Sequence, residues 1–188
     1  MTTHFDVDAA RAPARSIFHV DYPLEQLARS RTTRFQRGFA RMAMHLLPDF
    51  RDAALEASDK GLVILAASEL ALDSPTEVLR QIHGADVHIG APTVRLRNGD
   101  SVEEPIMWVR AAVPHADTES VVHELIGRSA DIEEVDWLAP CPVVRARAPL
   151  RELLGYPAAL SALCQGKAEL DMWLSHYAPL PPEPGDAA

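Results

Sequence analysis

The sequence predicts an α+β protein built from two tandem ferredoxin-like domains, each a split βαβ unit with the order β-α-β-β-α-β. Three observations support this fold class. The length of 188 residues suits two small domains. The apolar patterns run twice through the same order of strands and helices. The charge is also distributed unevenly between the two halves, since residues 1–101 carry a net charge of −1 and residues 102–188 a net charge of −8, of the formal −9.

Composition excludes several other classes of protein. Apolar residues make up 47% of the chain and charged residues 24%, as in ordinary globular proteins, and two cysteines are too few for a disulfide scaffold. The strongest apolar run, residues 62–67, is far shorter than the ~20 residues that cross a bilayer. The N-terminus lacks the basic-then-apolar order of a secretion signal. We therefore expect a cytoplasmic protein with no membrane partner, and the acidic balance argues against a dedicated nucleic-acid binder.

The first predicted domain covers residues 16–98 and follows a flexible N-terminus at residues 1–15. Its strands are predicted at residues 16–22, 52–57, 62–67 and 85–97. A long helix is predicted between the first two strands, because an apolar stripe repeats at helical spacing before Pro48 ends the pattern. The members of this stripe, which we expect to face the core, are Phe35, Phe39, Met42 and Leu46.

A second helix is predicted between residues 73 and 84 of the same domain. It opens with Asp73 and has a proline in its first turn, and Gly84 ends it. Its buried face is expected to carry Val78, Leu79 and Ile82.

The second predicted domain covers residues 103–178, after a linker at residues 99–102, and a proline-rich tail follows at residues 179–188. Its strands are predicted at residues 106–113, 131–138, 143–148 and 167–177. One helix is expected from Asp117, with Val121, Val122, Leu125 and Ile126 as its apolar residues, and a second over residues 150–165.

Several stretches of the chain are similar to segments of a known family. They are EEPIMWV at residues 103–109, VRARAPLRELLGYPAALSALCQG at 144–166 and LSHYAPLP at 174–181. In this order and at similar spacing they resemble the last domain of elongation factor G. The first half resembles the third domain of that factor through PDFR at 48–51, GLVILAASELAL at 61–72 and HIGAPTVRLR at 88–97. The resemblance covers most of residues 35–181 and implies two ferredoxin-like domains and a role at the ribosome.

The motifs of a GTPase do not occur in this sequence. It contains no GxxxxGK[ST] segment and no NKxD segment, so it offers no amide cradle and no lysine for nucleotide phosphates. We therefore expect no GTP binding by this chain and no cofactor, and we expect that it is not an enzyme.

An arginine row accompanies the apolar stripe of the first helix. Arg34, Arg37 and Arg41 recur at i, i+3 and i+7, Arg29 and Arg31 extend the row, and no acidic residue occurs between residues 25 and 49. The row is a candidate strip for rRNA phosphate, or for an acidic partner such as the second domain in the same chain or in a dimer. A solvated helix face remains the alternative interpretation.

Three further candidates for rRNA or partner binding come from the resemblance. Arg128 lies in GRSA at residues 127–130, where the family has a strongly basic turn, and Gln165 and Lys167 lie in the turn that corresponds to TQGRG. The resemblance implies that this domain has lost several phosphate contacts, because the other basic residues of both turns are replaced.

Other chemically capable residues are expected to be structural. His115, Asp117 and His123 have no recognised metal-ligand spacing, so we expect no metal site. Cys141 and Cys164 lack CxxC spacing. The tryptophans at 108, 137 and 173 are predicted on three strands of the second domain, where they can cluster on the open face of its sheet. We expect packing rather than base stacking there, because no basic residues interleave with them in the sequence.

Three functional hypotheses follow. The first is a non-catalytic protein resembling elongation factor G that binds the ribosome or a translation factor without hydrolysing GTP. The second is a protein–protein interaction module that kept the fold and lost ribosome binding, with self-association as one form of it. The third is a chain that acts in trans with a separate GTPase chain.

Overall fold

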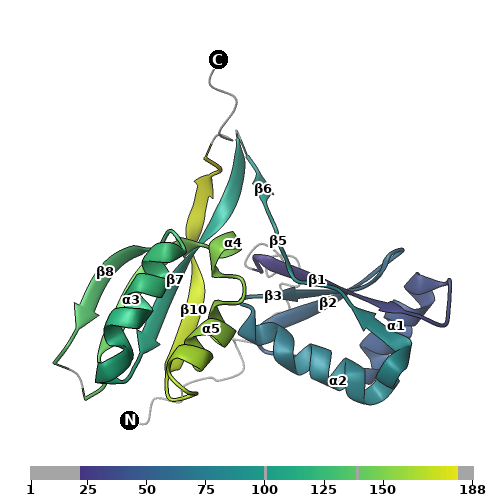
Figure 1. Ribbon diagram of the computed structural model, residues 1–188. Helices are drawn as coiled ribbons and strands as arrows, with labels where there is room; N and C mark the ends of the chain where they lie inside the picture. Colours follow the sequence, from purple (N-terminus) through teal and green to yellow (C-terminus); the bar gives the residue numbers. More distant parts are fainter. Residues whose placement is uncertain (1–21, 100, 139, 182–188) are drawn as a thin grey trace, which may run out of the picture.

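The computed structural model describes residues 22–99, 101–138 and 140–181 (Figure 1). The predicted flexible N-terminus and nearly all of the strand predicted at residues 16–22 lie outside the described residues, as does most of the proline-rich tail. The remainder forms two antiparallel sheets with helices, so the predicted α+β class is confirmed. Among the described residues, no helix is long and apolar enough to cross a membrane.

The first sheet has the strand order β2-β3-β1-β4, which is the arrangement of a split βαβ unit. A short fifth strand, β5, also pairs with β1. The elements of this unit are β1 (Leu24–Ser30), α1 (Gln36–Leu46), β2 (Ala53–Ser58), β3 (Gly61–Ala66), the 3₁₀ turn η3 (Leu70–Leu72), α2 (Asp73–His83), the 3₁₀ turn η4 (Gly84–Asp86), β4 (Val87–Ile89) and β5 (Thr93–Val94).

The central strand of this sheet was not predicted. The prediction placed the first strand at residues 16–22, whereas β1 begins at Leu24. Leu24, Leu27 and Ala28 recur at helical spacing, which favours a helix when residues are read locally. In the structure β1 pairs with both β3 and β4, and this pairing buries Leu24 and Ala28 completely. Tertiary pairing has therefore overridden the local pattern.

The predicted orientation of α1 is wrong, although the helix itself is confirmed. Only Phe39 of the predicted apolar stripe is buried, and it packs with Ala40 and Ala43. Phe35 remains 71% exposed, and Met42 and Leu46 each remain 53% exposed. The face turned to the sheet is thus made of small residues around one phenylalanine. In α2, Leu79 is buried as predicted, whereas Ile82 is exposed.

The second sheet repeats the topology with the strand order β10-β7-β9-β8. A short strand, β6, which lies before the predicted linker, pairs with β7 of this sheet. The elements are β6 (Arg97–Asn98), β7 (Val102–Ala112), the 3₁₀ turn η5 (His115–Asp117), α3 (Thr118–Gly127), β8 (Asp131–Asp136), β9 (Val143–Pro149), α4 (Leu150–Leu153), α5 (Tyr156–Leu163) and β10 (Glu169–Pro179).

The helix predicted over residues 150–165 is in fact two helices. Leu154 has an extended conformation, and Gly155 is left-handed with φ of 77°, so α4 ends and α5 begins at this point. The break presents the Gly155 N–H toward the first unit, where it donates a hydrogen bond of 2.7 Å to Glu69 Oε2. This bond joins the two units at the place where Figure 1 shows α4 and α5 beside the start of α2.

Alternation along the strands separates a helix-covered face from an open face in the second sheet. Met107, Val109 and Ala111 of β7 are fully buried. Their neighbours Trp108 and Arg110 point to the opposite side and pair in register with Arg147 and Arg145 of β9. The open face therefore carries the polar and aromatic side chains of the unit.

Candidate interaction surfaces

The predicted arginine row lies on α1 and just before it, and it is exposed. Arg37 Nη1 forms an ion pair of 3.3 Å with Asp59 Oδ1, in which both side chains are solvent-accessible, so the pair contributes little to stability. No described residue forms an ion pair with Arg34 or Arg41. These guanidinium groups are therefore available to a partner.

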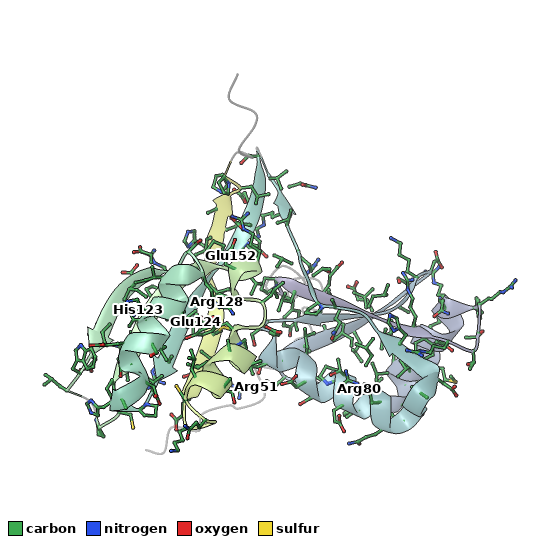
Figure 2. The ribbon with its side chains drawn as sticks, viewed as in Figure 1. Arg51, Arg80, His123, Glu124, Arg128 and Glu152 are labelled. Carbon is green, nitrogen blue, oxygen red and sulfur yellow. The ribbon has the colours of Figure 1, made fainter. Side chains whose placement is uncertain are left out.

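Arg128, in contrast, is engaged inside the second unit. Its Nε donates a hydrogen bond of 2.8 Å to Glu124 Oε1, and its Nη1 donates to the carbonyl oxygens of Glu152 and Leu154 at 2.8 and 3.1 Å. The guanidinium also lies 5.6 Å from the centroid of the Tyr156 ring. Figure 2 shows Arg128 between Glu124 on α3 and Glu152 on α4. The Arg128 side chain therefore links the end of α3 to the break between α4 and α5.

Gln165 and Lys167 lie in the turn between α5 and β10, and both side chains are exposed. Gln165 has a positive φ of 52°, and Lys167 N–H donates to Cys164 O at 2.9 Å, which closes the turn. The structure therefore separates the six predicted site residues into two groups. Figure 1 shows α1 at the end of the first unit that points away from the second unit, where Arg128, Gln165 and Lys167 lie.

The open face of the second sheet forms a surface that sequence reasoning recognised only in part. Trp108 and Trp173 stack with ring centroids 6.4 Å apart, and the Arg147 guanidinium lies 5.2 Å from the Trp108 centroid. Trp137 follows the end of β8 and does not share this cluster. The expectation that no basic residues accompany the tryptophans is wrong in space, because strand pairing places Arg147 next to Trp108 and the pair Arg110 and Arg145 beside it on the same face.

Acidic residues neutralise these arginines. Arg110 Nη1 lies 2.9 Å from Asp171 Oδ2, and Arg145 Nη1 lies 2.5 Å from Glu134 Oε2. Arg147 pairs with Glu133. The face is thus aromatic and balanced in charge, which suits a protein surface better than nucleic-acid phosphates. The alternation of acidic and apolar residues along β8 predicted an exposed acidic face. Which arginine each carboxylate meets depends on the register between β8 and β9, which the spacing along one strand does not reveal.

Three buried groups have perturbed acidity. Burial raises the pKa of Glu104, and the Arg151 guanidinium, with Nε 3.4 Å from Glu104 Oε2, opposes that shift in the pKa. Burial also raises the pKa of Tyr156 and that of the Cys164 thiol. The described residues contain no group of three or more histidine, cysteine, aspartate or glutamate side chains arranged to hold a metal ion.

A groove of about 470 Å³ lies where the two units meet. Phe50, Arg51 and Asp52 of the first unit line one part of it, and Met172 and Trp173 of β10 line another. The groove therefore connects the first unit with the edge strand that carries one of the stacked tryptophans.

Comparison with known proteins gives two findings. Residues 101–188 match the family model described as the elongation factor G C-terminus. A solved structure of a protein from Thermus thermophilus superposes with a TM-score of 0.63 and 15% sequence identity. The superposition covers 96% of this chain and 44% of that protein, so this chain spans less than half of the other's length. At 15% identity the likeness concerns the fold alone.

Proposed function

We propose that this chain binds the ribosome or a translation factor without hydrolysing GTP, because residues 101–188 match the family model of the elongation factor G C-terminus. The family match is the observation that carries the proposal. The exposed α1 arginines and the exposed turn with Gln165 and Lys167 support it, since both offer polar groups to a partner. The lack of GxxxxGK[ST] and NKxD segments supports the absence of GTP hydrolysis by these residues.

Cosedimentation with ribosomes in sucrose gradients, at low and at moderate salt, tests this function. We expect the purified chain to enter the ribosomal fractions at low salt and to dissociate as salt rises, because phosphate contacts release counterions. The variant Arg34→Glu/Arg41→Glu should bind less. The charge-matched control is Arg51→Glu/Arg80→Glu, since both arginines are exposed on the first unit and lie outside the arginine row (Figure 2).

Two results would contradict the proposal. One is a chain that remains in the soluble fractions at both salt concentrations, and the other is GTP hydrolysis by the purified chain above the background of ribosomes alone. Crosslinking mass spectrometry on the ribosomal fractions would identify the contacted component. It would also detect a separate GTPase chain, which is the partner expected if the protein acts in trans.

A second candidate function is a protein-interaction module, and the engagement of the basic residues in the second unit favours it. Arg128 is tied to Glu124 and to two carbonyl oxygens, and the arginines of the open face are paired with carboxylates. With a net charge of −8 over residues 102–188, this unit presents few cations to RNA. A pull-down with the purified chain as bait tests this function, and we expect it to recover a protein partner that stays bound after nuclease treatment.

A further inference from the structure

The outward face of α1 has the composition of a protein-docking surface. Phe35, Met42 and Leu46, which the core does not bury, belong to α1 or directly precede it, as do Arg34 and Arg41. The helix contains no acidic residue. Exposed apolar side chains rimmed by charges of one sign are typical of sites that receive a partner of the opposite charge.

A groove beside this helix extends the surface. It encloses about 490 Å³, and Phe35, Phe39, Met42 and His83 are among the residues that line it. Phe39 packs edge-on against His83, with ring centroids 5.2 Å apart, and so forms part of the floor between α1 and α2. A space of this size accommodates large apolar side chains.

The opposite end of the molecule offers a segment with the complementary composition. At the end of β8, Trp137 is 49% exposed and Leu138 is 97% exposed. Asp136 precedes them and accepts the Leu138 N–H at 3.0 Å, which orders the start of the loop. Glu133 and Glu134, earlier in the same strand, pair with Arg147 and Arg145, whereas no described residue forms an ion pair with Asp136. We name the segment from Asp136 to Leu138 the acidic tip.

The two surfaces lie too far apart to meet within one chain. Figure 1 shows α1 at the outer end of the first unit and the end of β8 at the outer end of the second unit, with both sheets between them. A contact between the two surfaces therefore requires two molecules.

We propose that the α1 face of one copy binds the acidic tip of a second copy, with Trp137 and Leu138 as apolar anchors and Arg34 and Arg41 opposite Asp136. This inference rests on the second candidate function, a protein-interaction module. The contact joins two different surfaces, so a pair of copies retains one unused surface of each kind. Copies therefore add head to tail, into a ring where the rotation between successive copies closes and into an open chain where it does not.

Sedimentation equilibrium of the purified full chain tests the proposal without ribosomes. The average mass should rise above 20.6 kDa with protein concentration and fall again as salt is added. Met42→Asp on the α1 face and Trp137→Asp on the acidic tip should each weaken association at least about tenfold. Both positions are exposed, so circular dichroism should show folded proteins. Ile126→Asp, which makes the same change of charge at an exposed apolar position of α3, is the matched control and should associate like the parent chain.

Mixing the two variants distinguishes this contact from every symmetric one. Each variant lacks one surface, but a mixture still holds one intact α1 face and one intact acidic tip, so we expect a heterodimer. A mixture that remains monomeric, or a parent chain that is monomeric at all concentrations, would overturn the proposal. Association that RNase treatment abolishes would also overturn it, because RNA would then be the bridging partner. Ribosome cosedimentation of the same variants is read separately, so loss of self-association leaves the first proposed function testable.

Discussion

Arg128 illustrates how a single side chain acquires a role from contacts that are remote in sequence. It lies at the end of α3, and its bonds to the carbonyl oxygens of Glu152 and Leu154 hold the break between α4 and α5. We expect Arg128→Met to lower the free energy of unfolding by about 1–3 kcal/mol, because two carbonyl oxygens and the Glu124 carboxylate lose their donor.

Urea unfolding measures this change in stability. Arg110→Met is the matched control, since its exposed pair with Asp171 should contribute less than about 1 kcal/mol. Equal losses from the two substitutions would show that Arg128 has no special structural role and would return it to the candidates for partner binding.

Glu104 is the residue for which stability should depend on pH. It is 3% exposed, and burial raises its pKa above the ordinary value of 4.5. The folded state therefore holds this proton more tightly than the unfolded state, so its contribution to stability is full below pH 4.5 and is lost as pH rises through the folded-state pKa. Glu104→Gln, which mimics the protonated form, should gain stability relative to the parent chain between acidic and neutral pH.

Urea unfolding of both proteins at acidic and neutral pH measures that difference. Glu103→Gln on the same strand controls for the removal of one carboxylate. A difference between Glu104→Gln and the parent chain that stays constant with pH, or that shrinks toward neutral pH, would refute the assignment.

At the scale of the secondary-structure elements, the β2–β3 hairpin depends on one glycine. Gly61 has φ of 137°, and a Cβ at this position would overlap the backbone carbonyl oxygen of Ala28 in the central strand. Gly84, which ends α2, also has a positive φ of 54°, but a Cβ there would meet no atom within 4 Å. We expect Gly61→Ala to cost at least about 3 kcal/mol of stability and Gly84→Ala only about 1–2 kcal/mol.

Thermal and urea unfolding of the two variants compare the penalties directly. Because both substitutions add one methyl group at a positive-φ position, their difference isolates the contact between the hairpin and β1. Similar losses in the two variants would mean that β1 can move away from the hairpin at little cost.

Local signals predicted elements well and their orientation poorly. Asp73 and Gly84 marked the bounds of α2 correctly, although Asp73 is the first helical residue and its side chain caps no backbone N–H, whereas Gly84 is the C-cap with a positive φ. The central strand β1 was missed, because its apolar residues recur at helical spacing and the strand forms only through pairing with β3 and β4. The α1 stripe pointed outward because alanines at positions 40 and 43, which carry little weight in an apolar pattern, fill the core contact instead.

The candidate surfaces were predictable to a similar extent. The exposed arginine row on α1 follows from helical spacing alone. The stacking of Trp108 on Trp173 and the arginines around them depend on the register of β7 with β9 and β10. That register is set by the whole sheet, so it cannot be predicted from the residue spacing along one strand.

At the scale of the whole molecule, the bond between Glu69 and the Gly155 N–H is expected to restrain the two units. The bond is 2.7 Å long and solvent-accessible, so its loss should cost about 1 kcal/mol. That is too little to unfold either unit but enough to widen their relative motion, because interfaces between units of one chain are commonly small. In Glu69→Ala we expect a broader distribution of distances between the units with an unchanged unfolding temperature.

Spin labels at the exposed Cys141 and at Lys60→Cys, one on each unit, report this distribution by double electron–electron resonance, since Cys164 is buried and escapes labelling. Glu77→Ala, on the exposed side of α2, removes an equal charge without touching the junction and should leave the distribution narrow.

The distance distribution between the units also bears on head-to-tail association. The α1 face and the acidic tip lie on different units, so their relative direction determines whether successive copies close into a ring. A junction loosened by Glu69→Ala should therefore favour smaller closed assemblies over longer open ones. An unchanged distance distribution would assign the restraint to the residues around the groove between the units, such as Phe50 and Trp173, rather than to the hydrogen bond.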